Sequence, residues 1–221
     1  MKSILTEQQT AFFTQNGYIE FELGLDSAPL FEGVRKALSE RLGVGQEKMG
    51  RKTAIEIYAA GRDVWRTVPS LHMLLLRKLS PIAQTLSGKR SLRFGCDQWI
   101  PAGYPWEKAG PSKDLFSIQG LALGLLIGAP QSPPTYRSHL GLLPLPSKPG
   151  NILFFRPNLI LDWPELASNP SSDLYLAAYA LPNAVYVQNP KDPSTNALKQ
   201  FGYGFGDLLR NEFHPLIPYN N

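Results

Sequence analysis

The hydrophobic pattern of this chain changes near Gly88, and that change limits the folds that it can adopt. Before Gly88, apolar residues recur at helical spacing, as at Leu30, Val34 and Leu38. After it come short apolar segments of strand length, separated by Pro, Gly, Ser and Asn; they cover residues 91–100, 116–127, 142–145, 151–156, 174–181 and 185–187. This order predicts an α+β fold with helices first and an antiparallel β core afterwards.

Local signals define the first elements. Thr6 and Gln9 have capping-box spacing, so a short helix is expected from there to Gly17. The alternation of apolar and polar residues over 18–22 is typical of a half-buried strand. Asp26 is placed to cap the helix that follows.

Further helices are expected at residues 70–78 and from Pro81 to Gly88. The sequence contains no repeat at a fixed period and no composition shift that would mark a linker. We therefore expect one domain over 1–221, in which 1–90 is mostly helical support, 91–190 is the core and 191–221 is a C-terminal extension.

Composition excludes several classes of protein. Of 221 residues, 43% are hydrophobic and 18% charged, which is typical of a folded protein. The single cysteine, Cys96, permits neither an intramolecular disulfide nor a cysteine metal cluster. The N-terminus lacks a signal-peptide apolar region, and the longest apolar run, around 120–129, is about half of a membrane span. These features predict a soluble cytoplasmic protein that does not bind membranes.

The charge is distributed unevenly although the formal net charge is only +4. Residues 35–93 contain 13 Lys and Arg against 4 Asp and Glu, whereas the rest of the chain is net acidic. Such an excess can attract nucleic acid or a phosphorylated small molecule. The charges are scattered, so we expect them mainly on solvent-facing helix surfaces. An alternative function is therefore that of a basic, metal-responsive regulator that binds nucleic acid.

Residues 201–206 alternate aromatic residues with glycine. In a β-strand, where successive side chains point to opposite faces, this spacing would place the three aromatic rings on one side. Packing over one end of the barrel is favoured, and stacking on a flat ligand stays open.

Several ordered segments resemble the phytanoyl-CoA dioxygenase-like family. Residues 5–19, with Asn-Gly-Tyr at 16–18, resemble its first helix and strand, and residues 92–99 resemble the strand with its Asp-Gln pair. Residues 138–155 resemble its Gly-Ser-His loop and the following Pro-Gly-Asp strand. The resemblance implies a double-stranded β-helix, a cupin-like jelly-roll core with N-terminal helices packed on one sheet. It also implies an ancestry among enzymes that use Fe(II), O2 and 2-oxoglutarate.

The resemblance also identifies the positions at which that family binds iron. Its His-x-Asp motif falls on Ser112 and Asp114, and its second histidine on Leu161. Two imidazoles are thus replaced, and a facial triad needs both of them with the carboxylate. Asp162, one residue later, could at most form a weak oxygen-only site with Asp114.

The family's 2-oxoglutarate clamp is an arginine, and the matching region here is at Leu174. No Lys or Arg occurs over residues 157–190. Asp97, Gln98 and His139 complete the residues expected to line the pocket. Neither iron nor 2-oxoglutarate is therefore expected as a cofactor, because Asp114 alone keeps a ligand position.

Besides an intact iron oxygenase with unconventional ligands, three functions remain open. The favoured one is a non-catalytic or repurposed oxygenase-like protein that binds an unknown small molecule or protein. The second is an enzyme of altered mechanism, built on Asp97, Ser112, Asp114 and Asp162. The third is the basic regulator described above.

Overall fold

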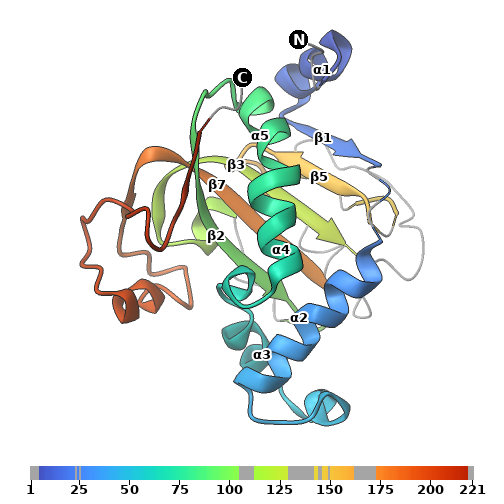
Figure 1. The fold of residues 1–221 in the computed structure, drawn as a ribbon, viewed down its shortest axis with the longest axis vertical. Coiled ribbons are helices and arrows are strands. Elements are labelled where there is room, and N and C mark those ends of the chain that lie inside the picture. The colour runs from blue at the N-terminus through green and yellow to red at the C-terminus, as the bar shows by residue number, and fades with distance from the viewer. Residues whose placement is uncertain are drawn as a thin grey trace.

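The computed structural model describes residues 5–22, 24, 26–104, 112–128, 142–143, 146–148, 150–161 and 173–218. These residues form a curled antiparallel sheet with helices across one of its faces (Figure 1). Within them, no helix is long and apolar enough to cross a membrane. Ser112 and Leu161 are described through their backbone alone, and His139 and Asp162 lie outside the described residues.

Most helices precede the sheet in the chain, as the change of pattern at Gly88 predicts. The helices are α1 (Glu7–Asn16), α2 (Ser27–Arg41), α3 (Ala54–Ala60), α4 (Pro69–Met73) and α5 (Ser80–Ser87). Shorter 3-10 or π turns are η1 (Gln46–Arg51), η2 (Val64–Arg66), η3 (Leu74–Lys78), η5 (Ser112–Leu115) and η6 (Ala197–Phe201).

The predicted helix signals are confirmed. Thr6 and Gln9 form both bonds of the capping box of α1, and the Asp26 side chain accepts from the Ala28 N–H at the start of α2. Gly88 ends α5 with a left-handed φ of 64°.

The main sheet contains six strands in the order β1-β5-β3-β7-β2-β8, all paired antiparallel. Its strands are β1 (Tyr18–Phe21), β2 (Leu92–Ile100), β3 (Ile118–Gly128), β5 (Ile152–Phe155), β7 (Leu174–Tyr186) and β8 (Leu216–Ile217). A second pair, β4 (Leu142–Leu143) with β6 (Ile160–Leu161), is parallel. β1 thus joins the sheet although it comes from the mostly helical first part of the chain.

The two strands expected at 174–181 and 185–187 are one strand, β7. It remains continuous through Pro182 because pairing with β2 stops at Ala180 and the β3 register shifts there. Proline lacks an N–H and is tolerated where a strand has no ladder partner.

The predicted helix at 70–78 contains a π turn, η3, between α4 and α5. The Tyr179 hydroxyl of β7 donates to the Leu75 carbonyl at 2.7 Å. A tertiary hydrogen bond thereby satisfies a carbonyl within the widened turn, which accounts for a feature that the helical pattern cannot signal.

Alternation along the strands creates two cores. Phe94, Trp99 and Tyr179 face the helices, whereas Leu176 and Phe155 face the opposite side, here called the inner face. The inner face is filled by side chains: a Cβ atom at Gly124 would lie 2.5 Å from the Phe155 ring.

The C-terminal segment (residues 187–218) covers part of the inner face with Leu198, Tyr203 and Leu209. The prediction of a strand with three aligned rings at 201–206 is wrong, because Gly202 and Gly206 have left-handed φ values of 75° and 100°. These turns bury Tyr203 and leave Phe205 39% exposed.

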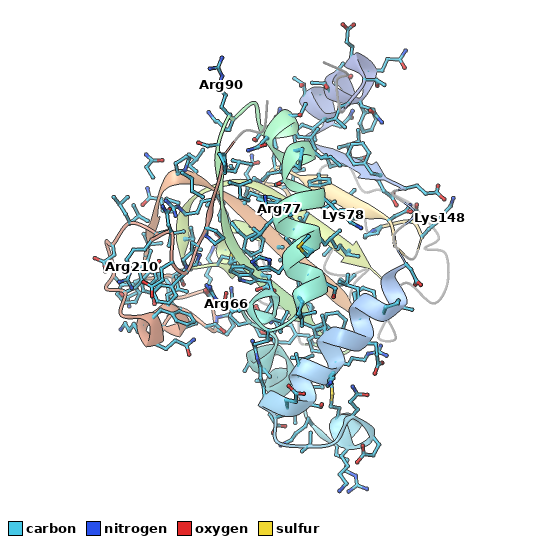
Figure 2. All side chains as sticks on the ribbon, in the orientation of Figure 1. Arg66, Arg77, Lys78, Arg90, Lys148 and Arg210 are labelled. Carbon is cyan, nitrogen blue, oxygen red and sulfur yellow. The ribbon has the colours of Figure 1, made fainter. Side chains whose placement is uncertain are left out.

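The basic residues of 35–93 fall into two groups. Figure 2 shows Arg90 well apart from Arg77 and Lys78, which lie next to each other on η3, and all three are exposed. Nine of the 13 are exposed: Arg35, Lys36, Arg41, Lys48, Arg51, Arg77, Lys78, Lys89 and Arg90. Arg66 and Arg93 instead bind the C-terminal segment, through the Phe213 carbonyl and through Asn211 and the His214 carbonyl. Part of the excess therefore stabilises the fold.

Candidate functional site

The described residues line an open cavity of about 430 Å³ where β3 begins and β7 ends. We call it the large cavity. Its walls come from η5, the first residues of β3, the turn after β5 and the residues that follow β7. They are Lys113, Asp114, Phe116, Ile118, Gln119, Gly120, Leu121, Pro157, Asn158, Val187, Gln188 and Asn189.

Asp114 lies in the wall of the large cavity, where Asn189 holds the local backbone. The Asn189 amide donates to the carbonyls of Asp114 and Phe116 at 3.0 and 3.1 Å. The Asp114 carboxylate accepts from the Lys191 ammonium at 2.7 Å. The carboxylate at the predicted iron position is therefore already neutralised by a side chain of this protein.

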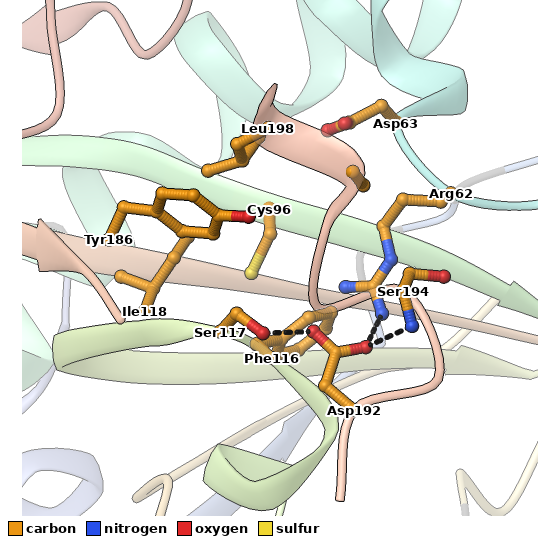
Figure 3. Close-up of a pocket in the computed structure, with 11 residues that line it drawn as sticks. Arg62, Asp63, Cys96, Phe116, Ser117, Ile118, Tyr186, Asp192, Ser194 and Leu198 are labelled. Atoms are coloured by element: carbon orange, nitrogen blue, oxygen red, sulfur yellow. Dashed lines mark hydrogen bonds and ion pairs between the residues drawn. The ribbon is translucent and has the colours of Figure 1, made fainter. Parts of the chain in front are cut away.

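A small cavity lies behind the large one, and the two share Phe116 and Ile118. Its volume of about 20 Å³ is sufficient for one water molecule. Figure 3 shows Asp192 at its edge, accepting from Arg62 and Ser117.

Asp192 is bound from three directions. The Arg62 guanidinium donates to it at 2.7 Å, the Ser117 hydroxyl at 2.8 Å and the Ser194 N–H at 2.8 Å. Burial by itself lowers the pKa of Arg62, whereas the adjacent Asp192 raises it, and the net change is upward. Arg62 thus stays charged, and its ion pair with Asp192 joins the start of β3 to the C-terminal segment.

Cys96 also lines the small cavity, as a free buried thiol. Burial raises the pKa of the Cys96 thiol well above its usual range. A neutral, inaccessible thiol is a poor nucleophile and a poor metal ligand.

Asp97 lies on the helix-covered face, among Trp65 and Tyr175, and not in either cavity. Its carboxylate accepts from the Tyr175 hydroxyl at 2.7 Å and from the Trp65 N–H at 2.9 Å. Burial, reinforced by Asp63, raises the pKa of Asp97 to about 7. Gln98, the next residue, points to the inner face and donates to the carbonyls of Tyr58 and Trp99.

Among the described site residues, Asp97, Asp114 and Leu174 lie apart from one another. Leu174 is buried at the start of β7, opposite Ile100 and Gly128. The large cavity with Asp114 lies beyond the other end of β7, so the length of the paired strand β3, roughly 30 Å, separates the two. Asp97 is separated from both by the sheet, which argues against a catalytic site that joins Asp97 to Asp114.

The residues that sequence reasoning missed are Arg62, Lys191 and Asp192. Arg62 and Asp192 are 130 positions apart, so no local spacing could pair them. The only local signal is Asn189-Pro190-Lys191-Asp192, whose Asn, Pro and Asp are typical of a turn.

The described residues do not fit a facial-triad iron site. No three His, Cys, Asp or Glu side chains among them lie close enough to share a metal ion. His72 is exposed and stacks on Trp65, whereas His214 is buried with its Nδ1 2.8 Å from the Gly95 carbonyl. Burial, together with Arg66, lowers the pKa of His214 to about 4, so the ring is neutral.

The sequence matches no protein-family model and no curated protein. Its fold is nevertheless shared with solved structures. The α-ketoglutarate-dependent carbocyclase SnoK from nogalamycin biosynthesis has a TM-score of 0.65 at 16% identity over 97% of both chains. The epimerase SnoN, solved in complex with Fe3+ and α-ketoglutarate, has a TM-score of 0.59 at 15% identity, over 96% of this chain and 98% of SnoN.

CytC3 with Fe(II) and α-ketoglutarate has a TM-score of 0.52 at 16% identity, over 96% of this chain and 88% of CytC3. All three proteins are named for, or were solved with, α-ketoglutarate, which is 2-oxoglutarate. At such identities the likeness concerns the fold. The chain therefore has the jelly-roll-like fold of the Fe/2-oxoglutarate-dependent oxygenases.

Proposed function

We propose that this protein is a degenerate, phytanoyl-CoA dioxygenase-like member of that fold class. In this proposal it does not catalyse oxygenation and instead binds a small molecule in the large cavity. One observation carries the proposal. Asp114, which stands at the family's carboxylate position, is bound by Lys191 at 2.7 Å and lies at the opposite end of β7 from Leu174.

The arrangement around Asp114 disfavours iron for a physical reason. A metal ion would have to displace the Lys191 ammonium and would then find a single carboxylate, since Ser112 and Leu161 supply no imidazole. A 2-oxoglutarate molecule would also lack an arginine at Leu174 for its distal carboxylate. Repairing one position leaves the other losses in place.

The large cavity supports a binding function. Its volume falls in the range of small-molecule sites, and it combines apolar side chains with a few polar groups. Phe116 and Ile118 provide a buried floor, while Gln119 and Asn158 are exposed at the wall. A cavity of this kind can bind an apolar body and orient it by hydrogen bonds.

The test is calorimetry of the pure protein with Fe(II) or Mn(II), with and without 2-oxoglutarate, alongside an assay for succinate. We expect no metal binding in the micromolar range and no succinate above background. Asp114→Asn is the matched control and should give the same traces as the unmodified protein. Micromolar metal affinity that is lost in Asp114→Asn, or stoichiometric succinate, would show that the proposal is wrong.

A further inference from the structure

The described wall of the large cavity carries an excess of positive charge. Lys113 lines the cavity, and Lys191 reaches its edge by binding Asp114. Asp114 is the only acidic residue among the described lining residues. Two ammonium groups therefore face one carboxylate.

We infer that the large cavity binds a small organic anion, namely a carboxylate or a phosphate monoester attached to an apolar body. This inference rests on the proposed function and adds the chemical class of the ligand. Lys113 and Lys191 would bind the anionic group. The ligand would be a molecule of metabolite size, given a cavity of about 430 Å³.

The polar side chains of the wall suit an anion. The side-chain amides of Gln119, Asn158 and Gln188 have no hydrogen-bond partner among the described residues, and all three residues are exposed. Their amide groups can donate to carboxylate or phosphate oxygens. Asn189, in contrast, is engaged with backbone carbonyls and acts as a fixed part of the wall.

A cation would be bound poorly at the same place. Asp114, the only acidic residue among the lining residues that the structure describes, is already paired at 2.7 Å, so a cation would have to displace Lys191 and approach Lys113. An anion adds to the existing pair without breaking it, because the Lys191 ammonium has three donors and Asp114 uses one.

The floor of the large cavity defines the rest of the ligand. Phe116 and Ile118 are buried, and Leu121 and Val187 are half-buried. Aromatic and branched side chains of this kind favour an apolar or aromatic body. The site also differs from the position that 2-oxoglutarate would inherit, because Leu174 lies at the other end of β7.

The experiment compares phenyl phosphate, benzoate and benzyl alcohol by calorimetry and ligand-observed NMR at fixed ionic strength. These probes share a ring and differ in charge and in the anionic group. We expect phenyl phosphate or benzoate to bind more tightly than benzyl alcohol, and the stronger of the two identifies the anionic group. Binding should weaken as salt concentration rises.

Lysine variants locate the site. Lys113→Met and Lys191→Met should each raise the dissociation constant of the tighter anion by about fivefold or more, since each removes one charge contact. Lys191→Met should have the larger effect because it also leaves Asp114 unpaired beside the ligand. Lys36→Met, at an exposed position on α2, is the matched control and should change nothing.

Val187→Trp provides a test independent of charge, because it fills the cavity from a half-buried wall position. We expect it to abolish binding of the anion while circular dichroism and the melting temperature stay unchanged. Equal binding of benzyl alcohol, or anion binding that survives both lysine variants and Val187→Trp, would overturn the assignment. Succinate release would instead refute the proposed function, so the two failures are distinguishable.

Discussion

Asp192 and Asp97 are both buried, on opposite faces of one sheet, but their surroundings differ. On the inner face, Asp192 is bound by the Arg62 guanidinium, a hydroxyl and a backbone N–H. On the helix-covered face, Asp97 has only the Tyr175 hydroxyl and the Trp65 N–H, and its Oδ1 atom has no partner among the described residues. Asp192 thus has a full counter-charge, whereas Asp97 has none, and burial without a counter-charge makes the stability contribution of Asp97 sensitive to pH.

The sign of this sensitivity follows from the direction of the shift. Burial and Asp63 raise the pKa of Asp97 to about 7, whereas an unfolded chain has a value near 4. Below about pH 4 Asp97 is protonated in both the folded and the unfolded protein, so it does not lower the free energy of unfolding. Between about pH 4 and 7 the folded protein holds a proton that the unfolded chain has lost, so stability falls as pH rises.

The largest expected effect comes from removing the counter-charge of Asp192. Arg62→Met leaves that carboxylate buried and unpaired, so the free energy of unfolding should fall by about 3–5 kcal/mol. Urea denaturation followed by circular dichroism measures the change.

Arg62→Met combined with Asp192→Leu is the control for that variant. Replacing both partners removes the unpaired charge, so the double variant should recover a large part of the loss. If the double variant were less stable than the single one, the hydrogen bonds that Asp192 accepts from Ser117 and Ser194 would stabilise the fold by more than the unpaired charge costs.

The second largest effect on stability should come from Asp97, whose buried carboxylate has no counter-charge. Asp97→Asn keeps an acceptor for Tyr175 and Trp65 but cannot ionise. From pH 5 to pH 8 the unmodified protein should lose about 2.5 kcal/mol of stability through Asp97, given its pKa of about 7, and the variant should lose none of this part. Denaturation midpoints at pH 5, 6, 7 and 8 measure how the stability of the unmodified protein and of Asp97→Asn changes with pH.

Tyr175→Phe sharpens the same measurement. It removes one donor to the ionised Asp97, so the pKa of Asp97 should rise further and the loss of stability should begin at the same pH but extend higher. Parallel pH profiles of the unmodified protein and Asp97→Asn would contradict the assignment of the slope to Asp97.

Local chemistry made much of the fold predictable. The capping box at Thr6, the cap at Asp26 and the glycine at position 88 each act within a few residues, so the sequence alone specifies them. The capping box of Thr53 and Glu56 gives α3 the same kind of signal, although α3 was not predicted. In contrast, the π turn depends on Tyr179 and the continuity of β7 depends on a shift in register, and both arise from tertiary pairing.

The candidate site was less predictable for the same reason. Matching Asp114 to a family motif does not reveal that Lys191 binds it from 77 positions away. Both Asp97 and Gln98 were expected to line the pocket, although alternation along β2 places neighbouring side chains on opposite faces; alternation does not show which face the helices cover. The identity of each face is set by the packing of the whole chain.

The smallest effect on stability is expected for Lys191→Met. This ion pair is as short as that of Arg62 with Asp192, 2.7 Å in both, yet the Lys191 side chain is 64% exposed and the Arg62 side chain only 9%. Water and salt screen the exposed pair, so its removal should change the free energy of unfolding by less than about 1 kcal/mol. Urea denaturation of Lys191→Met and Arg62→Met under the same conditions measures the difference between the two losses of stability.

A loss as large as that of Arg62→Met would mean that Lys191 holds the C-terminal segment in place. A weaker anion affinity in Lys191→Met would then reflect an altered fold. A small loss, together with weakened anion binding, would assign Lys191 to the ligand and Arg62 to the scaffold.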